Sequence, residues 1–147
     1  MSNKFAQGVY TVMNPAKYVG SSAPKFRSSW ENNFFRFLDT HPGILQWASE
    51  SVRIPYRHPL TGRPATYIPD LLIQYVDKGN SVKVELIEIK PSSQTSLQEA
   101  KSKHDKLHAV VNQAKWAAAH AWCKSQGITF RVVTEREIFG GKYKRGR

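Results

Sequence analysis

Cysteine is almost absent from this sequence, and so are long apolar runs. The single cysteine, Cys123, cannot form an internal disulfide, which fits a reducing compartment such as the cytoplasm. No apolar stretch is long enough to span a membrane, and the first residues lack the charged and then apolar pattern of a secretory signal. We therefore expect no membrane segment, and we expect Cys123 to be a small residue of the core.

Negative charge is also scarce. The chain of 147 residues has 22 Lys and Arg against 11 Asp and Glu, which gives a net charge of +11. Such an excess in a chain of single-domain size favours a polyanionic partner, with DNA or RNA as the leading class. Membrane headgroups fit less well, because no strongly amphipathic basic helix is evident. The charge alone does not distinguish an enzyme from a binding module.

Several common functional signatures are missing as well. The sequence has no glycine-rich phosphate loop and no internal repeat. His104 and His108 stand four residues apart, but neither a third ligand nor an HExxH context accompanies them. The histidines therefore give no indication of a zinc site.

A β-hairpin pattern is present in the middle of the chain. An apolar run at residues 71–76 and an alternating run at residues 82–90 flank a polar, glycine-bearing turn. In an antiparallel hairpin the start of one strand lies beside the end of the next, so Asp70 and Glu88 should meet at one end of the sheet. Glu88 and Lys90 are two residues apart, and we expect them to share a face.

Two carboxylates and one ammonium would then converge at one point. A buried carboxylate pair is unfavourable unless a cation neutralises it. Oxygen ligands with room for water suit Mg²⁺ or Mn²⁺. The alternative for these residues is a surface salt-bridge cluster, because such short motifs often occur by chance.

The remaining pattern predicts helices and strands on both sides of this hairpin. The arm at residues 1–24 is expected to be irregular, and Ser28 and Glu31 in capping-box spacing open a helix that ends before His41. A loop and first strand are expected within 44–56, where Val52, Ile54 and Tyr56 alternate. A long helix at 97–125, stopped by Gly127, follows the hairpin, with its charged part at 98–106 as an alternative separate or frayed segment; a strand at 128–133 and a short final helix from Thr134 complete the pattern. The expected apolar face of the long helix is Leu107, Val110, Val111, Ala114, Ala118, Ala121 and Trp122.

The hairpin ends resemble a known catalytic motif. Pro69-Asp70, followed after seventeen residues by Glu88-Ile89-Lys90, is similar to the PD-(D/E)XK motif of restriction-endonuclease-like nucleases. The predicted order of elements is similar to their α-β-β-β-α-β core. The resemblance therefore implies an α/β fold with a mixed sheet flanked by helices.

A narrower resemblance extends over more of the chain. The segments Phe-x-Gln-Gly and Tyr-x-x-x-Asn-Pro-x-Lys-Tyr near the start, Arg-Ser-Ser-Trp-Glu at residues 27–31 and Tyr-x-Pro-Asp at residues 67–70 resemble the head completion nucleases of T4-like tailed phages. Residues 27–134 also resemble the transposase subunits that cut transposon ends. On this basis we expect an arm at 1–24, a nuclease domain at 25–139 and a basic tail at 140–147.

The resemblance implies metal-dependent hydrolysis of DNA phosphodiester bonds. Asp70, Glu88 and the carbonyl of Ile89 would bind Mg²⁺, with Mn²⁺ as an alternative ion. Glu31 would bind the same ion through water, or a second ion, although its capping role is a sufficient structural explanation. Lys90 would orient the attacking water or stabilise the transition state. Gln113 is a candidate auxiliary residue, with an ordinary helix-surface role as the alternative.

The substrate implied is double-stranded DNA, and low sequence specificity is expected because no base-reading motif is present. The candidate DNA-contacting residues, which could equally be solvated charges, are Arg27, Arg53, Arg57, Arg63, Lys142, Lys144 and Arg145. In the phage family such cutting processes packaged DNA before the head joins the tail. That implies capsid or portal components as partners, in the host cytoplasm during virion assembly or retained in the virion. The alternatives are a structural head-tail adaptor with a vestigial site and a transposon-end endonuclease subunit.

Overall fold

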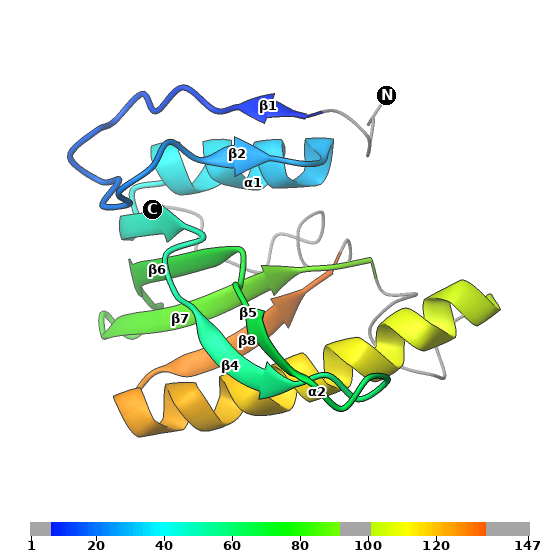
Figure 1. Ribbon diagram of the computed structural model, residues 1–147. Coiled ribbons are helices and arrows are strands. Elements are labelled where there is room, and N and C mark those ends of the chain that lie inside the picture. The colour runs from blue at the N-terminus through cyan, green and yellow to red at the C-terminus, as the bar shows by residue number, and fades with distance from the viewer. Residues whose placement is uncertain (1–6, 92–100, 135–147) are drawn as a thin grey trace.

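A four-stranded mixed sheet forms the centre of the computed structural model, which describes residues 7–91 and 101–134 (Figure 1). The strands lie in the order β3 (Ile44–Ser49), β6 (Leu71–Val76), β7 (Val82–Ile89) and β8 (Thr129–Val133). The pairs β3/β6 and β6/β7 are antiparallel, whereas β7/β8 is parallel. This mixed α/β architecture confirms the predicted fold class.

Two helices cover opposite faces of the sheet, as Figure 1 shows: α1 (Ser29–Thr40) and α2 (Lys103–Gln126). Side chains alternate across a strand, so Ile87 of β7 belongs to the core under α1 and Leu86 belongs to the core under α2. Within the described ranges, no helix is both long and apolar enough to cross a membrane. The sheet is therefore a middle layer, with one hydrophobic core on each side.

Helix α1 begins where the sequence predicts. The Ser28 side chain caps it by accepting a hydrogen bond from the Glu31 N–H at 3.2 Å. Phe34, Phe35 and Leu38 are buried against the sheet. The helix ends at Thr40, in front of the predicted stop.

The N-terminal segment is bound to α1 through one buried carboxylate. Asp39 is fully buried and accepts hydrogen bonds from the Tyr10 hydroxyl at 2.7 Å, the Met13 N–H at 2.7 Å and the Asn14 N–H at 3.0 Å. Within this segment the short strand β1 (Gly8–Val9) pairs with β2 (Lys25–Phe26). The arm thus packs along the outer side of α1 (Figure 1).

The first strand of the sheet was predicted in the wrong place. Residues 44–49 form β3, whereas Ile54–Arg57 form β4, which pairs with β5 (Pro64–Tyr67) in a separate two-stranded sheet. A register irregularity between Ile44 and Gln46 breaks the alternation in β3 and hides the strand from a pattern search. The alternation at 52–56 is real, but it reflects packing of the β4–β5 hairpin against α2.

The predicted apolar face of α2 was only partly right: Ala118 and Trp122 pack against the core, but none of the predicted residues is among the buried ones. The residues that the helix buries are Ala109, Asn112, Trp116, Ala119 and Cys123. They follow the helical repeat, but the stripe includes a polar residue, while Leu107 from the expected face is 45% exposed. Cys123 is buried, as the sequence indicates.

The ends of α2 can be compared with the prediction as well. The helix begins at Lys103, after an N-cap at Ser102, within the charged part 98–106 for which a separate segment was the alternative. It ends at Gln126, and the predicted stop Gly127 is its C-cap, in a left-handed conformation with φ of 73°. The predicted helix after Thr134 and the basic tail at 140–147 lie outside the described residues. The three segment boundaries stay predictions.

Candidate active site

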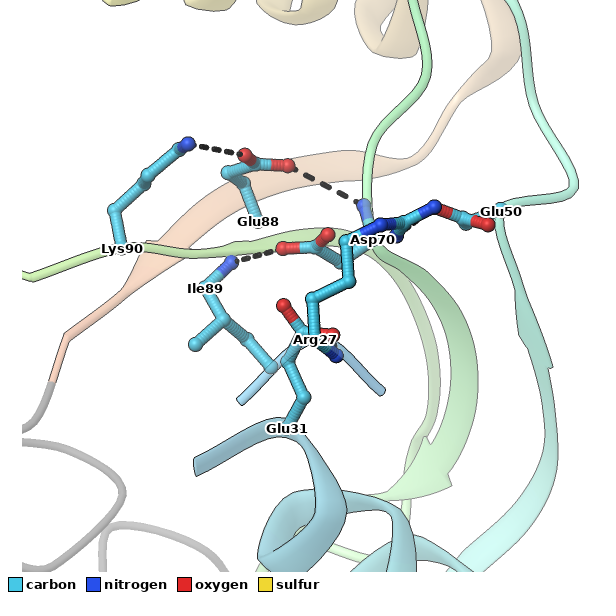
Figure 2. Close-up of polar contacts among 7 residues, drawn as sticks. All are labelled: Arg27, Glu31, Glu50, Asp70, Glu88, Ile89 and Lys90. Atoms are coloured by element: carbon cyan, nitrogen blue, oxygen red, sulfur yellow. Dashed lines mark hydrogen bonds and ion pairs between the residues drawn. The ribbon is translucent and has the colours of Figure 1, made fainter. Parts of the chain in front are cut away.

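The β6–β7 hairpin brings Asp70 and Glu88 together. Its register pairs Leu71 with Ile87, so the residues just before β6 and near the end of β7 are neighbours. The Asp70 N–H lies 3.3 Å from Glu88 Oε1 and donates to it, and the Ile89 N–H donates to Asp70 Oδ2 at 2.7 Å (Figure 2). Two hydrogen bonds thus hold Asp70, just before β6, against the end of β7 that carries Glu88.

Glu31 approaches the same region from a different layer. It lies in the first turn of α1, where its N–H is bonded to Ser28 and its Oε1 accepts a hydrogen bond from the Arg27 N–H at 3.0 Å. The Ser28 half of the predicted capping box is present, but the Glu31 carboxylate accepts from Arg27, the residue before the N-cap, instead of from Ser28. Figure 2 shows the side chain rising from the start of α1 toward Asp70. The capping role of Glu31 thus also orients it toward the acidic pair.

The three carboxyl groups disfavour one another's ionised forms. Burial raises the pKa of Asp70 well above its usual value, and the charges of Glu88 and Glu31 raise it further. Burial also raises the pKa of Glu88, although Lys90 acts in the opposite direction. Burial raises the pKa of Glu31, while the Arg27 N–H partly offsets this effect. A cation placed among these groups would favour the charged form of each.

One ammonium already lies at the pair. The Lys90 Nζ is 3.6 Å from Glu88 Oε2, and the Lys90 side chain is 26% exposed (Figure 2). Arg27 and Lys115 also lie close enough for their charges to act on these acids. Even so, burial keeps the pKa values of all three carboxyl groups raised.

The donor set fits a hard divalent cation. Carboxylate oxygens are the ligands that Mg²⁺ and Mn²⁺ prefer, usually together with retained water. Among residues 7–91 and 101–134, no three His, Cys, Asp or Glu side chains are grouped closely enough to form a complete metal cage. Asp70 and Glu88 would therefore need a main-chain carbonyl, water or a movement of Glu31 to complete the coordination. Such an open arrangement suits a catalytic magnesium site better than a closed structural site.

Arg27 and Glu50 form a second polar contact beside Asp70. The Arg27 guanidinium donates to Glu50 Oε2 at 2.5 Å, and the Glu50 N–H donates to the Asp70 carbonyl at 2.9 Å (Figure 2). Glu50 has a φ of 51°, an uncommon value for a residue with a side chain. Arg27 was predicted to contact DNA, but in the structure its guanidinium forms an ion pair with Glu50, a residue that the sequence analysis did not consider.

The other candidate residues belong to other elements of the fold or lie outside the described ranges. Gln113 is exposed on α2. Arg57 and Arg63 belong to the β4–β5 hairpin and its loop, and Arg57 donates to the Gly62 carbonyl at 2.6 Å. Arg53 is exposed just before β4. Lys142, Lys144 and Arg145 lie outside the described residues.

The sequence analysis gave no site role to Tyr67 or Lys115, which both lie beside Glu88. Burial raises the pKa of Tyr67, and charge on Glu88 raises it further. Burial lowers the pKa of Lys115, whereas Glu88 and Asp70 act to raise it. Tyr67 could have been suspected from its position in the Tyr-x-Pro-Asp segment. Lys115 lies on the helix where Gln113 was the candidate, and hydrophobicity does not show which of its polar residues faces the acidic pair.

Comparisons with known proteins show similarity to an endonuclease family and to a phage nuclease. Residues 41–135 match the family model described as TnsA-like endonuclease N terminal. The matched range includes Asp70, Glu88 and Lys90 but begins after Glu31. The chain is also 35% identical over 141 residues to the head completion nuclease of Enterobacteria phage T4, and the match covers 87% of this chain and 90% of that protein.

Proposed function

The chain belongs to the TnsA-like endonuclease N-terminal family, and from this premise we propose that it is a metal-dependent nuclease that hydrolyses DNA phosphodiester bonds. The observation that carries the proposal is the linked pair of Asp70 and Glu88, with Lys90 at 3.6 Å from the Glu88 carboxylate. This set matches the residue types that the catalytic motif requires. The excess of positive charge supplies affinity for a polyanion without sequence readout.

The roles of the residues follow from their positions. Asp70 and Glu88 would hold Mg²⁺ or Mn²⁺, with the Ile89 carbonyl as a third protein ligand and Glu31 as a ligand through water or to a second ion. When bound, the ion supplies a water of lowered pKa and neutralises charge that develops on the phosphate. Lys90 would donate a hydrogen bond to the attacking water or to a phosphate oxygen. Its compact ammonium suits this task better than a planar guanidinium.

The biological role is inferred from the T4 relative, which is named a head completion nuclease. We infer that this chain processes packaged double-stranded DNA before the phage head joins the tail. Capsid or portal components are then its partners, and the host cytoplasm, or later the virion, is its location. The family model favours one further candidate, a subunit that cuts transposon ends.

Cleavage of supercoiled plasmid in Mg²⁺ tests the proposal. The wild type should cleave the plasmid, and Glu88→Gln should not. A matched control is Asp77→Asn, which changes an acid at the opposite end of the same hairpin and keeps an acceptor for the turn N–H groups. Equal activity of wild type and Glu88→Gln would contradict the assigned site. Inactivity of both, with head-tail joining intact in Glu88→Gln, would favour a structural adaptor.

A further inference from the structure

Lys115 is a second ammonium at the acidic pair, and it lies outside the PD-(D/E)XK motif at residues 69–90. It lies on α2, the helix that covers the Glu88 side of the sheet, and it is partly buried. Burial lowers the pKa of Lys115, and the charge of Lys90 lowers it further, whereas Glu88 and Asp70 act to raise it. The Lys115 side chain is thus close enough to both acids and to Lys90 for their charges to be felt.

An aromatic ring holds Lys115 in this position. Its Nζ lies 5.7 Å from the centroid of the Tyr67 ring, which is within the range of a cation–π contact. Tyr67 is only 3% exposed and packs in the α2 core with Trp116, so its ring is a rigid platform. This contact orients the Lys115 ammonium without using its hydrogen-bonding capacity.

The Tyr67 hydroxyl is buried beside Glu88 and the Trp116 indole. Burial is the largest cause of its raised pKa, and hydrogen bonding with Glu88 adds to this effect whereas hydrogen bonding with Trp116 opposes it. Lys90 forms an ion pair with Glu88, but among the described residues Lys115 forms no ion pair within 4 Å. The ring beneath Lys115 is therefore held by polar contacts at its hydroxyl, whereas the ammonium has no acidic partner at ion-pair distance.

Two ammonium groups at one site destabilise the folded protein unless anions are present. Asp70 and Glu88 supply negative charge, but in the proposed function these carboxylates neutralise a divalent ion. The nearest remaining anion is then the substrate, whose phosphates carry one negative charge each. An ammonium fixed on an aromatic platform is suited to such a contact, because little side-chain freedom is lost on binding.

We propose that Lys115 binds a backbone phosphate of the DNA beside the phosphate that is cleaved, and that Tyr67 is its positioning residue. The inference rests on the proposed nuclease function and deepens it. It assigns Lys90 to the reacting group and Lys115 to the neighbouring phosphate. The alternative is that Lys115 is a structural counter-ion of Glu88, and the two roles predict different measurements.

The test is DNA binding in an Asp70→Asn background, which prevents cleavage during the measurement. Lys115→Gln is added to this background, and binding of a fluorescent duplex is followed by anisotropy at several salt concentrations. Removing one lysine–phosphate contact should weaken binding about 3- to 30-fold and make the slope of log affinity against log salt shallower by about 1. A matched control is Lys83→Gln, at the far end of β7, which should change both quantities less.

Variants of Tyr67 test the positioning role. Tyr67→Phe keeps the ring and should bind DNA like the reference. Tyr67→Leu removes the ring and should reproduce the loss caused by Lys115→Gln, without a further loss in the double variant. Independent, additive losses from Tyr67→Leu and Lys115→Gln would contradict the positioning role.

Thermal unfolding separates the two roles of Lys115. A phosphate-binding lysine held beside Lys90 predicts that Lys115→Gln keeps or raises the melting temperature of the DNA-free protein. A fall of several degrees would assign Lys115 to structure and overturn the proposal, as would unchanged affinity and salt slope. If the wild type cleaves plasmid but Lys115→Gln binds normally, only this inference fails. If the wild type neither cleaves nor binds DNA, the proposed function itself fails.

Discussion

The Ile89 N–H donates a 2.7 Å hydrogen bond to Asp70 Oδ2, so the strand that presents Glu88 also fixes the carboxylate of Asp70. The converse contact is longer: the Asp70 N–H lies 3.3 Å from Glu88 Oε1. Hydrogen bonds to the charged form of a carboxyl group favour ionisation, but here burial and the neighbouring acids act more strongly in the opposite direction. The geometry of the pair is fixed, while burial keeps the pKa values of both carboxyl groups raised.

Stability of the metal-free protein should therefore fall as pH rises. In the folded state the pKa values of Asp70, Glu88 and Glu31 are raised above the ordinary carboxyl value near 4. At pH values between that ordinary value and the raised values, the folded state therefore binds more protons than the unfolded state. The free energy of unfolding then decreases through that window. Urea unfolding with a chelator, at steps from pH 4.5 to pH 8, measures the trend. Stability that rises across this range would contradict the assignment.

Removing one acid should stabilise the chelated protein while abolishing activity. Asp70→Asn keeps an acceptor for the Ile89 N–H and deletes one of the repelling charges. At pH 7.5 with a chelator, we expect its melting temperature to exceed that of the wild type by about 2–8 °C. Its stability should also depend less on pH. Asp77→Asn is the control, and a melting temperature for Asp70→Asn that falls instead would show that the carboxylate has a structural role.

A bound divalent ion should make the wild type more stable than the variants that lack one acid. An ion that binds only the folded state adds about 2.7 kcal/mol of stability when its concentration is one hundred times its dissociation constant. Titration of Mg²⁺ or Mn²⁺ should thus raise the melting temperature of the wild type and leave that of Asp70→Asn or Glu88→Gln nearly unchanged. Equal shifts in wild type and variants would mean that the ion binds elsewhere.

Glu31 offers a way to separate capping from catalysis. Its N–H donates to the N-cap Ser28, and its carboxylate accepts from the N–H of Arg27, the residue before the cap. Glu31→Gln keeps an oxygen acceptor, so its melting temperature should stay close to that of the wild type, whereas its cleavage rate should fall at least tenfold. Ser28→Ala is the converse variant and should lose about 1 kcal/mol of stability while it retains cleavage. Full activity in Glu31→Gln would restrict this residue to capping.

Asp39 anchors the N-terminal segment and should matter for stability alone. Burial would raise its pKa, but the hydrogen bonds from Met13, Tyr10 and Asn14 outweigh that effect and lower it. Because the pKa of Asp39 is lowered in the folded state, its ionised carboxylate stabilises the fold at pH values above the ordinary carboxyl pKa. That stabilisation is lost as the pH falls through the lowered pKa. Asp39→Ala should destabilise the protein by about 2–4 kcal/mol in urea unfolding at neutral pH. A loss below about 0.5 kcal/mol would show that the arm is not held through this residue.

The hairpin could be predicted from sequence because its register depends on local features. A polar turn and two adjacent β-rich runs place residues 70 and 88 side by side without knowledge of the rest of the fold. The side of α2 that faces the sheet could not be obtained in this way. Its buried stripe includes Asn112 and small residues such as Ala109, so hydrophobicity alone selects a different face. Lys115 and its contact with Tyr67 were hidden by the same error.

Contacts between loops that are distant in the sequence could not be predicted from it either. Arg27 precedes α1 and Glu50 follows β3, so their ion pair depends on how two layers of the fold are joined. The strand β3 was missed because its irregular register breaks the period of two. Local patterns thus predicted the centre of the candidate site, whereas the charged residues around it depend on packing between distant segments.

The most direct measurement is the rate at which the purified protein converts supercoiled plasmid to nicked or linear DNA in Mg²⁺. The account predicts cleavage by the wild type and by Asp77→Asn, none in the presence of a chelator, and a rate at least about a hundredfold lower for Glu88→Gln with an unchanged fold. Cleavage by Glu88→Gln at the wild-type rate would contradict the account.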